Sequence, residues 1–453
     1  MWTVAQLAAD LAAGRTTSRR LTEQALARIA DPAGEGGRAF LKVYADSALA
    51  DADTADRLRK SGVRRSPVDG LPVSLKDLFD VAGDVTRAGS KVHHQKAESD
   101  AAAVARLRAA GAVFVGRTNM VEFAFGTTGI NPHYGTPRSP WDRPKWNAAE
   151  PLTGRVPGGS SSGAAVAQAD GMCVMALGSD TRGSVRIPAA FCGVTGFKPT
   201  TRRVPREGAF PLSYTLDSIG PLANSVACCA AYDAILAGEA PDALAELPAR
   251  GLRLLVPKSA VMEGLDREVA EAFNSAVERL KRAGAVVTEK PLPAFDRQSE
   301  YFKGGGFAGA EAYAIHRKNA DRLSEYDPRV AKRVLLGKDL SAADFVELTL
   351  LRTAYQREVE AALAPFDAFL LPTTPCVPPP IAEVNASDES YFRWNMRILG
   401  IVGLVNFLDG CAVSLPCQAA GAAPVGLMVS GPAMSDRRIL AVAAAIERTL
   451  ARD

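Results

Sequence analysis

The architecture of this chain is easiest to see in residues 157–193, which read PGGSSSGAAVAQADGMCVMALGSDTRGSVRIPAAFCG. The small residues of PGGSSSGAA allow tight turns, and the AAVAQADGM that follows has helical composition, so Ser160–Ser162 should lie where a helix begins. The next segment, MALG, has the character of a short apolar strand. A glycine-containing loop follows, and a second helix is predicted to start after Pro188. The stretch therefore predicts a turn, a helix, a strand, a loop and a helix in succession.

The same alternation extends in both directions along the chain. Helices ended by glycine are followed by apolar strands, as in a parallel sheet covered by helices. The expected helices lie at 18–30, 101–111 and 268–285, and the expected strands within 71–81, 112–119, 252–256 and 286–290. We predict an α/β fold with one mixed, mostly parallel, twisted sheet covered by helices on both faces.

No Pro, Gly or Ser linker divides the chain, so we expect a single domain over residues 1–453. Residues 60–230 should carry the catalytic core. The N-terminal helices of 1–60 and the C-terminal part at 231–453 should complete the same fold. The proline-rich segment 370–381 follows a strand-like run and should form a rigid loop within it.

Composition limits the setting. Lys and Arg total 53 against 50 Asp and Glu, and a net charge of +3 gives no reason to expect nucleic acid or an anionic membrane as a partner. Seven cysteines without a C-x-x-C pair predict small buried side chains in a reducing compartment. The N-terminus lacks the continuous apolar segment of a signal peptide, and apolar runs elsewhere stop well short of the roughly 20 residues needed to span a bilayer. We therefore expect a cytoplasmic protein.

The chemistry points to a serine nucleophile. In Asp180–Ser184, successive backbone N–H groups are expected to converge beside Ser184 and form an oxyanion hole. A base must take the proton of the serine, and the histidines are poorly placed for this, because they lie in polar segments without an orienting carboxylate: His93, His94, His133 and His316. Lys76 in LPVSLKDLFDV is the better candidate, since burial lowers a lysine pKa from about 10.4 towards neutrality. The scattered histidines predict no metal site, and we expect no cofactor.

Three segments together resemble the amidase signature family of amide hydrolases: GLPVSLKD at 70–77, GGSSSG at 158–163 and DTRGSVRIPAAFCGVTGFKPT at 180–200. The spacing of 24 between Ser160 and Ser184 equals that between the two active serines of the family. The similarity covers most of the chain from about residue 18, including NMVEFAFG, LDSIGPLA and LLPTTP. Without the segment at 180–200, GGSSSG could equally be a flexible turn. Lys76 considered alone would be interpreted as a surface lysine.

The resemblance implies roles for the three residues. Ser184 would be acylated, Lys76 would be the general base, and Ser160, next to a cis peptide bond, would pass the proton between them. The backbone amides of Thr181, Arg182, Gly183 and Ser184 would bind the oxyanion. The resemblance also suggests a homodimer that acts on a small-molecule amide.

Pocket-lining and supporting roles can be assigned to further residues, from less specific sequence signals. By analogy with the family, the acyl pocket would be lined by Phe125, Gly126, Thr128 and Gly159, although Phe125 would equally suit the core. Structural support would come from Ser161, Asp180 and Arg186. The charges of Asp180 and Arg186 suggest catalysis at first sight, but the serine–lysine relay leaves no step for a carboxylate, so a structural ion pair is the favoured interpretation.

The chain departs from the family pattern at two places. Arg182 occupies a position where the family usually has glycine. Its guanidinium would select an acidic or carbonyl-bearing substrate if it points inward, and would have no such effect if it points to solvent. The segment 143–155 is longer than usual and is a candidate wall of the substrate entrance.

The favoured function is a free-standing amidase that hydrolyses a carboxamide C–N bond through an acyl-enzyme. The alternative is the glutaminase subunit of a transfer-RNA-dependent amidotransferase, which has the same fold and works inside a complex. A non-catalytic scaffold is disfavoured because Lys76, Ser160 and Ser184 are all present.

Overall fold

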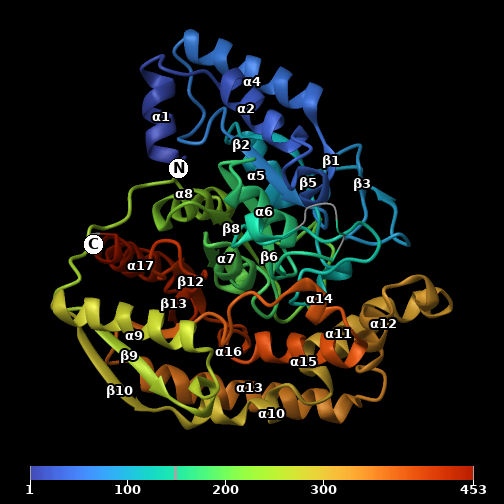
Figure 1. The fold of residues 1–453 in the computed structure, drawn as a ribbon, viewed down its shortest axis with the longest axis vertical. Coiled ribbons are helices and arrows are strands. Elements are labelled where there is room, and N and C mark those ends of the chain that lie inside the picture. Colours follow the sequence, from blue (N-terminus) through green and yellow to red (C-terminus); the bar gives the residue numbers. More distant parts are fainter. Residues whose placement is uncertain (1, 147–149, 151, 452–453) are drawn as a thin grey trace.

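Eleven strands form one continuous sheet in the computed structural model, which describes residues 2–146, 150 and 152–451 (Figure 1). In order across the sheet they are β1 (Phe40–Val43), β5 (Val113–Thr118), β2 (Pro72–Lys76), β6 (Met175–Asp180), β8 (Ser218–Ala223), β7 (Thr195–Lys198), β12 (Cys411–Pro416), β13 (Gly426–Gly431), β11 (Ala368–Pro372), β9 (Arg253–Lys258) and β10 (Val286–Pro291). The short strands β3 (Val85–Thr86) and β4 (Gln95–Lys96) pair separately.

Parallel pairing occurs in two groups, β5–β2–β6 and β11–β9–β10. The strands between these groups are joined by antiparallel pairs, and β1 is antiparallel to β5. The predicted α/β class, with one large mixed sheet flanked by helices, is confirmed. Because β2 and β6 are parallel neighbours, their carboxyl ends meet at the same edge of the sheet, which is where ligands bind in such folds.

The helices cover both faces of the sheet. Helix α2 begins where the sequence predicts, with Thr17 Oγ1 accepting a hydrogen bond from the Arg20 amide. The helices are α1 (Val4–Ala12), α2 (Ser18–Ala30), α3 (Gly36–Ala39), α4 (Ala45–Lys60), α5 (Ala102–Ala109), α6 (Ser162–Ala169), α7 (Arg186–Cys192), α8 (Val226–Ala237), α9 (Arg267–Arg282), α10 (Gln298–Tyr301), α11 (Gly306–His316), α12 (Pro328–Leu335), α13 (Ala342–Leu363), α14 (Ile381–Val384), α15 (Asp388–Leu399), α16 (Gly403–Leu408) and α17 (Asp436–Leu450).

Strand side chains alternate between two differently organised cores. On one face, Met175 and Leu177 of β6 belong to a core that continues along the whole sheet beneath α8, α17 and α9. On the other face, Ala176 belongs to a core with α6, whereas Ala412 and Met428 belong to a separate core with α16. This second face is therefore divided between an N-terminal and a C-terminal core.

Helix α7 lies where these two cores meet. Its Ala189 packs into the N-terminal core, and its Ile187 and Phe191 pack into the C-terminal core. The helix begins at Arg186 and not after Pro188, which corrects the prediction. Pro188 is accommodated because the first turn of a helix needs no amide donor at that position. The loop that precedes α7, residues 181–185, is thereby placed at the boundary between the two cores.

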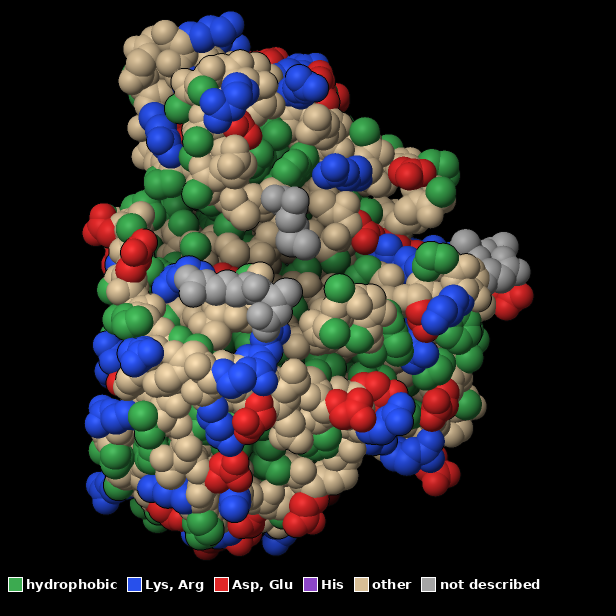
Figure 2. Space-filling model, turned by 60° about the vertical axis from the view of Figure 1, so that its left-hand side comes forward, with side chains coloured by type: hydrophobic (Ala, Val, Ile, Leu, Met, Phe, Trp, Pro, Cys, Tyr) green, Lys and Arg blue, Asp and Glu red, His purple; other side chains and the backbone are tan. Residues whose placement is uncertain are grey.

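All seven cysteines are buried thiols, as their apolar surroundings predict. Within the described part of the chain, no helix has the length and apolar character to cross a membrane. Over the face shown in Figure 2, basic and acidic side chains are interspersed and do not gather by sign, in keeping with the net charge of +3.

Candidate active site

Lys76, the last residue of β2, is completely buried and joins two serines. Its Nζ lies 2.7 Å from Ser160 Oγ and 2.8 Å from Ser179 Oγ. Burial lowers the pKa of Lys76 to about 7, although the carboxylates of Asp217 and Asp180 act in the opposite direction. A substantial fraction of Lys76 is therefore neutral near pH 7, the state in which it can accept a proton.

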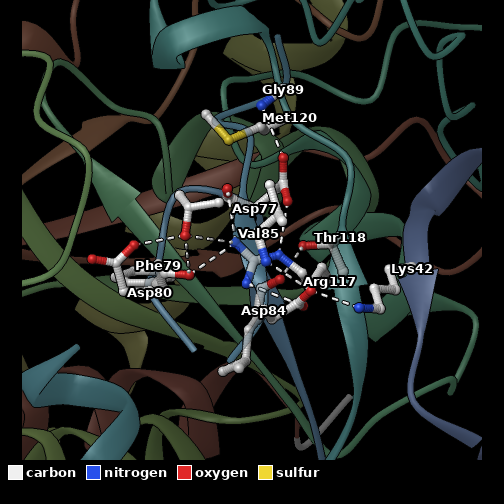
Figure 3. A network of polar contacts seen from close by, with 12 residues as sticks. Lys42, Asp77, Phe79, Asp80, Asp84, Val85, Gly89, Arg117, Thr118 and Met120 are labelled. Carbon is white, nitrogen blue, oxygen red and sulfur yellow. Dashed lines mark hydrogen bonds and ion pairs between the residues drawn. The ribbon is translucent and has the colours of Figure 1, made fainter. Parts of the chain in front are cut away.

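The residue after Lys76 anchors the end of β2. Asp77 Oδ1 accepts a hydrogen bond from Arg117 Nε at 2.8 Å, and both side chains are fully buried. Figure 3 shows Arg117 at the centre of a polar network in which it also reaches the Phe79 carbonyl at 2.9 Å, while Asp77 accepts from the Gly89 amide at 3.0 Å. This network fixes the backbone on the C-terminal side of Lys76.

Ser160 follows a cis peptide bond between Gly159 and Ser160, as the resemblance implies. The Gly159 amide donates to the Thr127 carbonyl at 2.7 Å, and the Val121 amide donates to the Ser160 carbonyl at 3.1 Å. These bonds hold the residues before α6 against segment 121–129, and so place the Ser160 hydroxyl beside Lys76.

Ser184 lies on the neighbouring loop and is 4% exposed. The Ser161 amide donates to the Ser184 carbonyl at 3.2 Å, which ties the two serine-bearing loops together. Within the described residues, the Ser184 hydroxyl makes no hydrogen bond, so no direct bond joins it to the Ser160 hydroxyl. The structure thus brings Lys76 and Ser160 into direct contact and Ser184 onto the adjoining loop.

The Asp180 carboxylate organises the loop around Ser184. It accepts hydrogen bonds from the Gly183 amide at 2.7 Å and from the Val185 amide at 3.2 Å. The Gly183 N–H is therefore engaged and not free for an oxyanion, which corrects the prediction for that residue. In the described part of the chain, the amides of Thr181, Arg182 and Ser184 have no such acceptor.

Arg186 completes this arrangement with a buried, two-pronged ion pair. Its Nε and Nη2 each lie 3.0 Å from the Asp180 carboxylate, and its Nη2 lies 2.6 Å from Asn406 Oδ1. Asn406 Nδ2 in turn donates to Asp180 at 2.8 Å. Burial alone would raise the pKa of Asp180, but the charge and hydrogen bonds of Arg186 hold this pKa well below its usual range. The charges of Asp180 and Arg186 are thus satisfied by each other and by Asn406 of α16.

Arg182 points inward. Its Nε is buried, and its Cζ lies 3.6 Å from the centre of the Phe302 ring. On the other side, a Cβ placed on Gly403 would lie 3.2 Å from the same Nε. The guanidinium therefore does not take the solvent-facing orientation that the sequence left open, and packs against Phe302 and Gly403 of α16.

The residues predicted to line the acyl pocket, Phe125, Gly126, Thr128 and Gly159, are all buried. Gly159 has no room for a side chain, because a Cβ there would lie 2.8 Å from the Gly129 amide nitrogen. Thr128 is fully buried, and a Cβ on Gly126 would lie 2.8 Å from Tyr391 Oη. Phe125 is 5% exposed and belongs to the main core, as its alternative interpretation allows.

A cavity of about 370 Å³ has Ser179, the second serine bonded to Lys76, in its lining. Its lining includes Leu78, Phe210, Asp217 and Ser218. The predicted entrance segment 143–155 contains residues 147–149 and 151, which lie outside the described residues.

Ser179 and Asn406 were not identified from the sequence. Ser179 precedes Asp180 at the end of β6, so recognising β2 and β6 as parallel neighbours would have placed it beside Lys76. Asn406 lies 220 positions from Arg186, and no local pattern links the two. Among the residues described, no group of three metal-binding side chains is found.

Comparison with known proteins identifies the family. Residues 20–440 match the family model described as Amidase. The chain belongs to the amidase family. It is 36% identical to 2-amino-5-chloromuconic acid deaminase of Comamonas testosteroni, covering 87% of this chain and 85% of that protein. It is also 35% identical to the A-type subunit of glutamyl-tRNA(Gln) amidotransferase from Chromohalobacter salexigens, over 97% and 95% of the two chains.

The fold agrees with that assignment. A solved crystal structure of an amidase superposes with a TM-score of 0.86 at 34% identity, covering 99% of both chains. The resemblance seen in the sequence is thus confirmed at the level of the family, and this amidase is a hydrolase of that family.

Proposed function

We propose that this amidase hydrolyses the C–N bond of a small carboxamide through a Ser184 acyl-enzyme. The observation that carries the proposal is the buried Lys76, whose Nζ lies 2.7 Å from Ser160 Oγ beside the Ser184 loop. A neutral lysine has one lone pair, so it can accept the Ser160 proton while donating to Ser179 Oγ at 2.8 Å. Ser160 then becomes an acceptor for the Ser184 proton.

The reaction would proceed in two halves. The Ser184 oxygen bonds to the carbonyl carbon as its proton moves to Ser160 and the Ser160 proton moves to Lys76. Backbone amides of the loop, other than the engaged Gly183, stabilise the oxyanion. The relay reverses to protonate the leaving nitrogen as the C–N bond breaks, and water then cleaves the acyl ester by the same route.

The direct test is ammonia release from a panel of substrates by the purified chain. The panel contains glutamine, malonamate, benzamide, indole-3-acetamide, a peptide amide, biuret and 2-amino-5-chloromuconic acid, the compound in the name of one relative. We expect turnover that is abolished in Ser184→Ala and reduced by several orders of magnitude in Lys76→Ala. Ser162→Ala is the matched control, because Ser162 belongs to the same serine cluster and its hydroxyl contacts the Asn119 carbonyl at 3.4 Å. Undiminished turnover in Ser184→Ala would refute the mechanism.

The alternative function, that of a glutaminase in an amidotransferase complex, is supported by the similarity to such a protein over 97% of the chain. It predicts activity with glutamine alone, and ammonia transfer only when partner proteins are present. Ser184-dependent hydrolysis of other amides by the isolated chain would exclude it as the main activity.

A further inference from the structure

Two arginines near the proposed site lack a negative partner. Within the described part of the chain, neither Arg182 nor Arg333 forms an ion pair, and Arg182 Nε is buried without any hydrogen-bond partner. Arg333 is 9% exposed and comes from α12. Most other buried arginines, such as Arg117 and Arg186, are paired with aspartates. The two unpaired arginines therefore require an explanation of their own.

Arg333 is fixed against the predicted pocket wall. Its Nη1 donates to the Phe125 carbonyl and to Asn395 Oδ1, each at 3.0 Å, and its Cζ lies 4.3 Å from the centre of the Phe125 ring. Asp327 is an acidic residue whose charge acts on Arg333, but its carboxylate accepts a hydrogen bond from the Arg329 amide at 2.9 Å. Arg333 is thus held by neutral groups and keeps its positive charge uncompensated.

The two charges influence each other. Burial and, to a smaller extent, the positive charge of Arg333 lower the pKa of Arg182 to about 9. Arg182 nevertheless remains a cation at neutral pH. Burying a cation without a counter-ion costs free energy that a bound anion would recover.

A third donor lies in the same region. Tyr391 is fully buried, and its hydroxyl has no hydrogen-bond partner among the described residues. It lies beside Gly126, where a Cβ would be 2.8 Å from the Tyr391 hydroxyl oxygen and 3.7 Å from Arg333 Nη1. An unsatisfied hydroxyl and an unsatisfied guanidinium N–H together form a donor set suited to a carboxylate.

We propose that Arg182 binds a carboxylate of the substrate, and that the protein acts on short amides whose acyl part carries this carboxylate. The proposal rests on the proposed Ser184 nucleophile. Arg182 lies on the Ser184 loop, two residues before the proposed nucleophile, and its Nε has no partner within the protein, so a carboxylate bound there would belong to the acyl part of the same substrate. Monoamides of short dicarboxylic acids are the simplest molecules that carry both groups. Arg182 is a specificity-determining residue in this scheme and takes no part in proton transfer.

The kinetic test compares acids with their neutral counterparts. Malonamate and succinamate are assayed against malonamide and succinamide. Relative to the wild type, Arg182→Gln should lower the ratio of kcat/KM for the acids to kcat/KM for the diamides by roughly 10- to 100-fold, the effect of losing a charged hydrogen bond. The same ratio for Arg182→Lys should lie between those of the wild type and Arg182→Gln, because lysine keeps the positive charge but lacks the planar guanidinium. Arg202→Gln, an exposed arginine without a described side-chain contact, is the matched control.

Two kinetic results would overturn the proposal. An equal loss for acids and diamides in Arg182→Gln would mean that Arg182 only shapes the loop. Wild-type preference for the diamides would mean that the two arginines do not attract a carboxylate.

A binding measurement separates this inference from the proposed function. Calorimetric titration of Ser184→Ala with malonate and succinate requires no turnover. We expect binding that weakens at least about tenfold when Arg182→Gln is added. Such binding would support the inference even if no amide were hydrolysed, in which case the proposed function alone would fail. No binding, or binding independent of Arg182, would overturn the inference whatever the hydrolysis assays show.

Discussion

At the scale of single residues, the buried charged side chains of this protein differ in whether an opposite charge lies beside them. Asp180 and Arg186 neutralise each other completely, whereas Lys76 is paired only with hydroxyl groups. Lys76 is consequently a buried group whose protonation can change near neutral pH. The proposed relay depends on this difference, because a base must be able to lose its proton under working conditions.

The pH dependence of kcat/KM should report the protonation of Lys76. Its pKa is lowered by burial to about 7, so the protonated, inactive form dominates below that pH and the neutral form above it. We expect kcat/KM to rise with pH through a midpoint near 7. The residual activity of Lys76→Ala should lack this rise, whereas Ser162→Ala should retain it. A rise that persists unchanged in Lys76→Ala would remove the lysine from the role of base.

The Asp180–Arg186 pair should be important for stability as well as activity. Asp180→Asn leaves Arg186 buried without a counter-ion, a change that typically costs about 3–5 kcal/mol in the free energy of unfolding. Urea denaturation measures this cost. Glu278→Gln, which removes an exposed ion pair with Lys281, should cost less than about 1 kcal/mol and serves as the control. Similar stabilities of the two variants would contradict the interpretation.

At the scale of elements, the site is built from strand ends and helix starts that lie very close to one another. Helix α6 approaches the end of β5 so closely that a Cβ on Gly163 would lie 2.3 Å from the Ala39 carbonyl and 2.7 Å from the Asn119 amide nitrogen. Ser160 precedes this helix by two residues. The position of the serine therefore depends on the absence of a side chain at Gly163.

Gly163→Ala should displace the start of α6 and reduce both stability and activity. Overpacking of this kind typically costs about 1–3 kcal/mol, and the movement would separate Ser160 from Lys76. Gly37→Ala is the matched control, because Gly37 is also helical and a Cβ there meets nothing within 4 Å. Thermal unfolding and kcat/KM should both distinguish the two variants, and a fully active Gly163→Ala enzyme would contradict this account.

Much of the element pattern was predictable from local signals. The cap at Thr17, the glycine stop at Gly111 and the alternation around α9 give elements close to those observed. The antiparallel centre of the sheet was not predictable, because β7 pairs with β12 and their residues, such as Lys198 and Ala412, are far apart in sequence. The contribution of α16 to the site was missed for the same reason.

At the scale of the whole molecule, the sheet makes the two parts of the chain interdependent. Strand β12 pairs with β7, and α17 packs against both α8 and α9 (Figure 1). One core extends along the full length of the sheet. A fragment that ends before β9 would expose the edge of β7 and most of the core beneath α17.

We therefore expect residues 1–240 alone to be unable to fold, although they contain every residue of the proposed relay. Circular dichroism and solubility would show this directly. A variant that lacks only α1, which packs on the outside of α8, is the control and should remain folded. A soluble, cooperatively unfolding 1–240 fragment would show that the N-terminal part is an independent domain.

The bonds that join Arg186 to Asn406 and to the Val402 carbonyl at 3.1 Å have a consequence for exchanging parts between relatives. The loop that carries Ser184 is held by helix α16, which lies more than two hundred positions later in the chain. If residues 157–193 were transferred into another amidase, they would be separated from Asn406 and Val402, which bind Arg186 in this chain. Recombination between members of this family should succeed when residues 157–193 and α16 are exchanged together. The serine motif and α16 therefore form one structural unit.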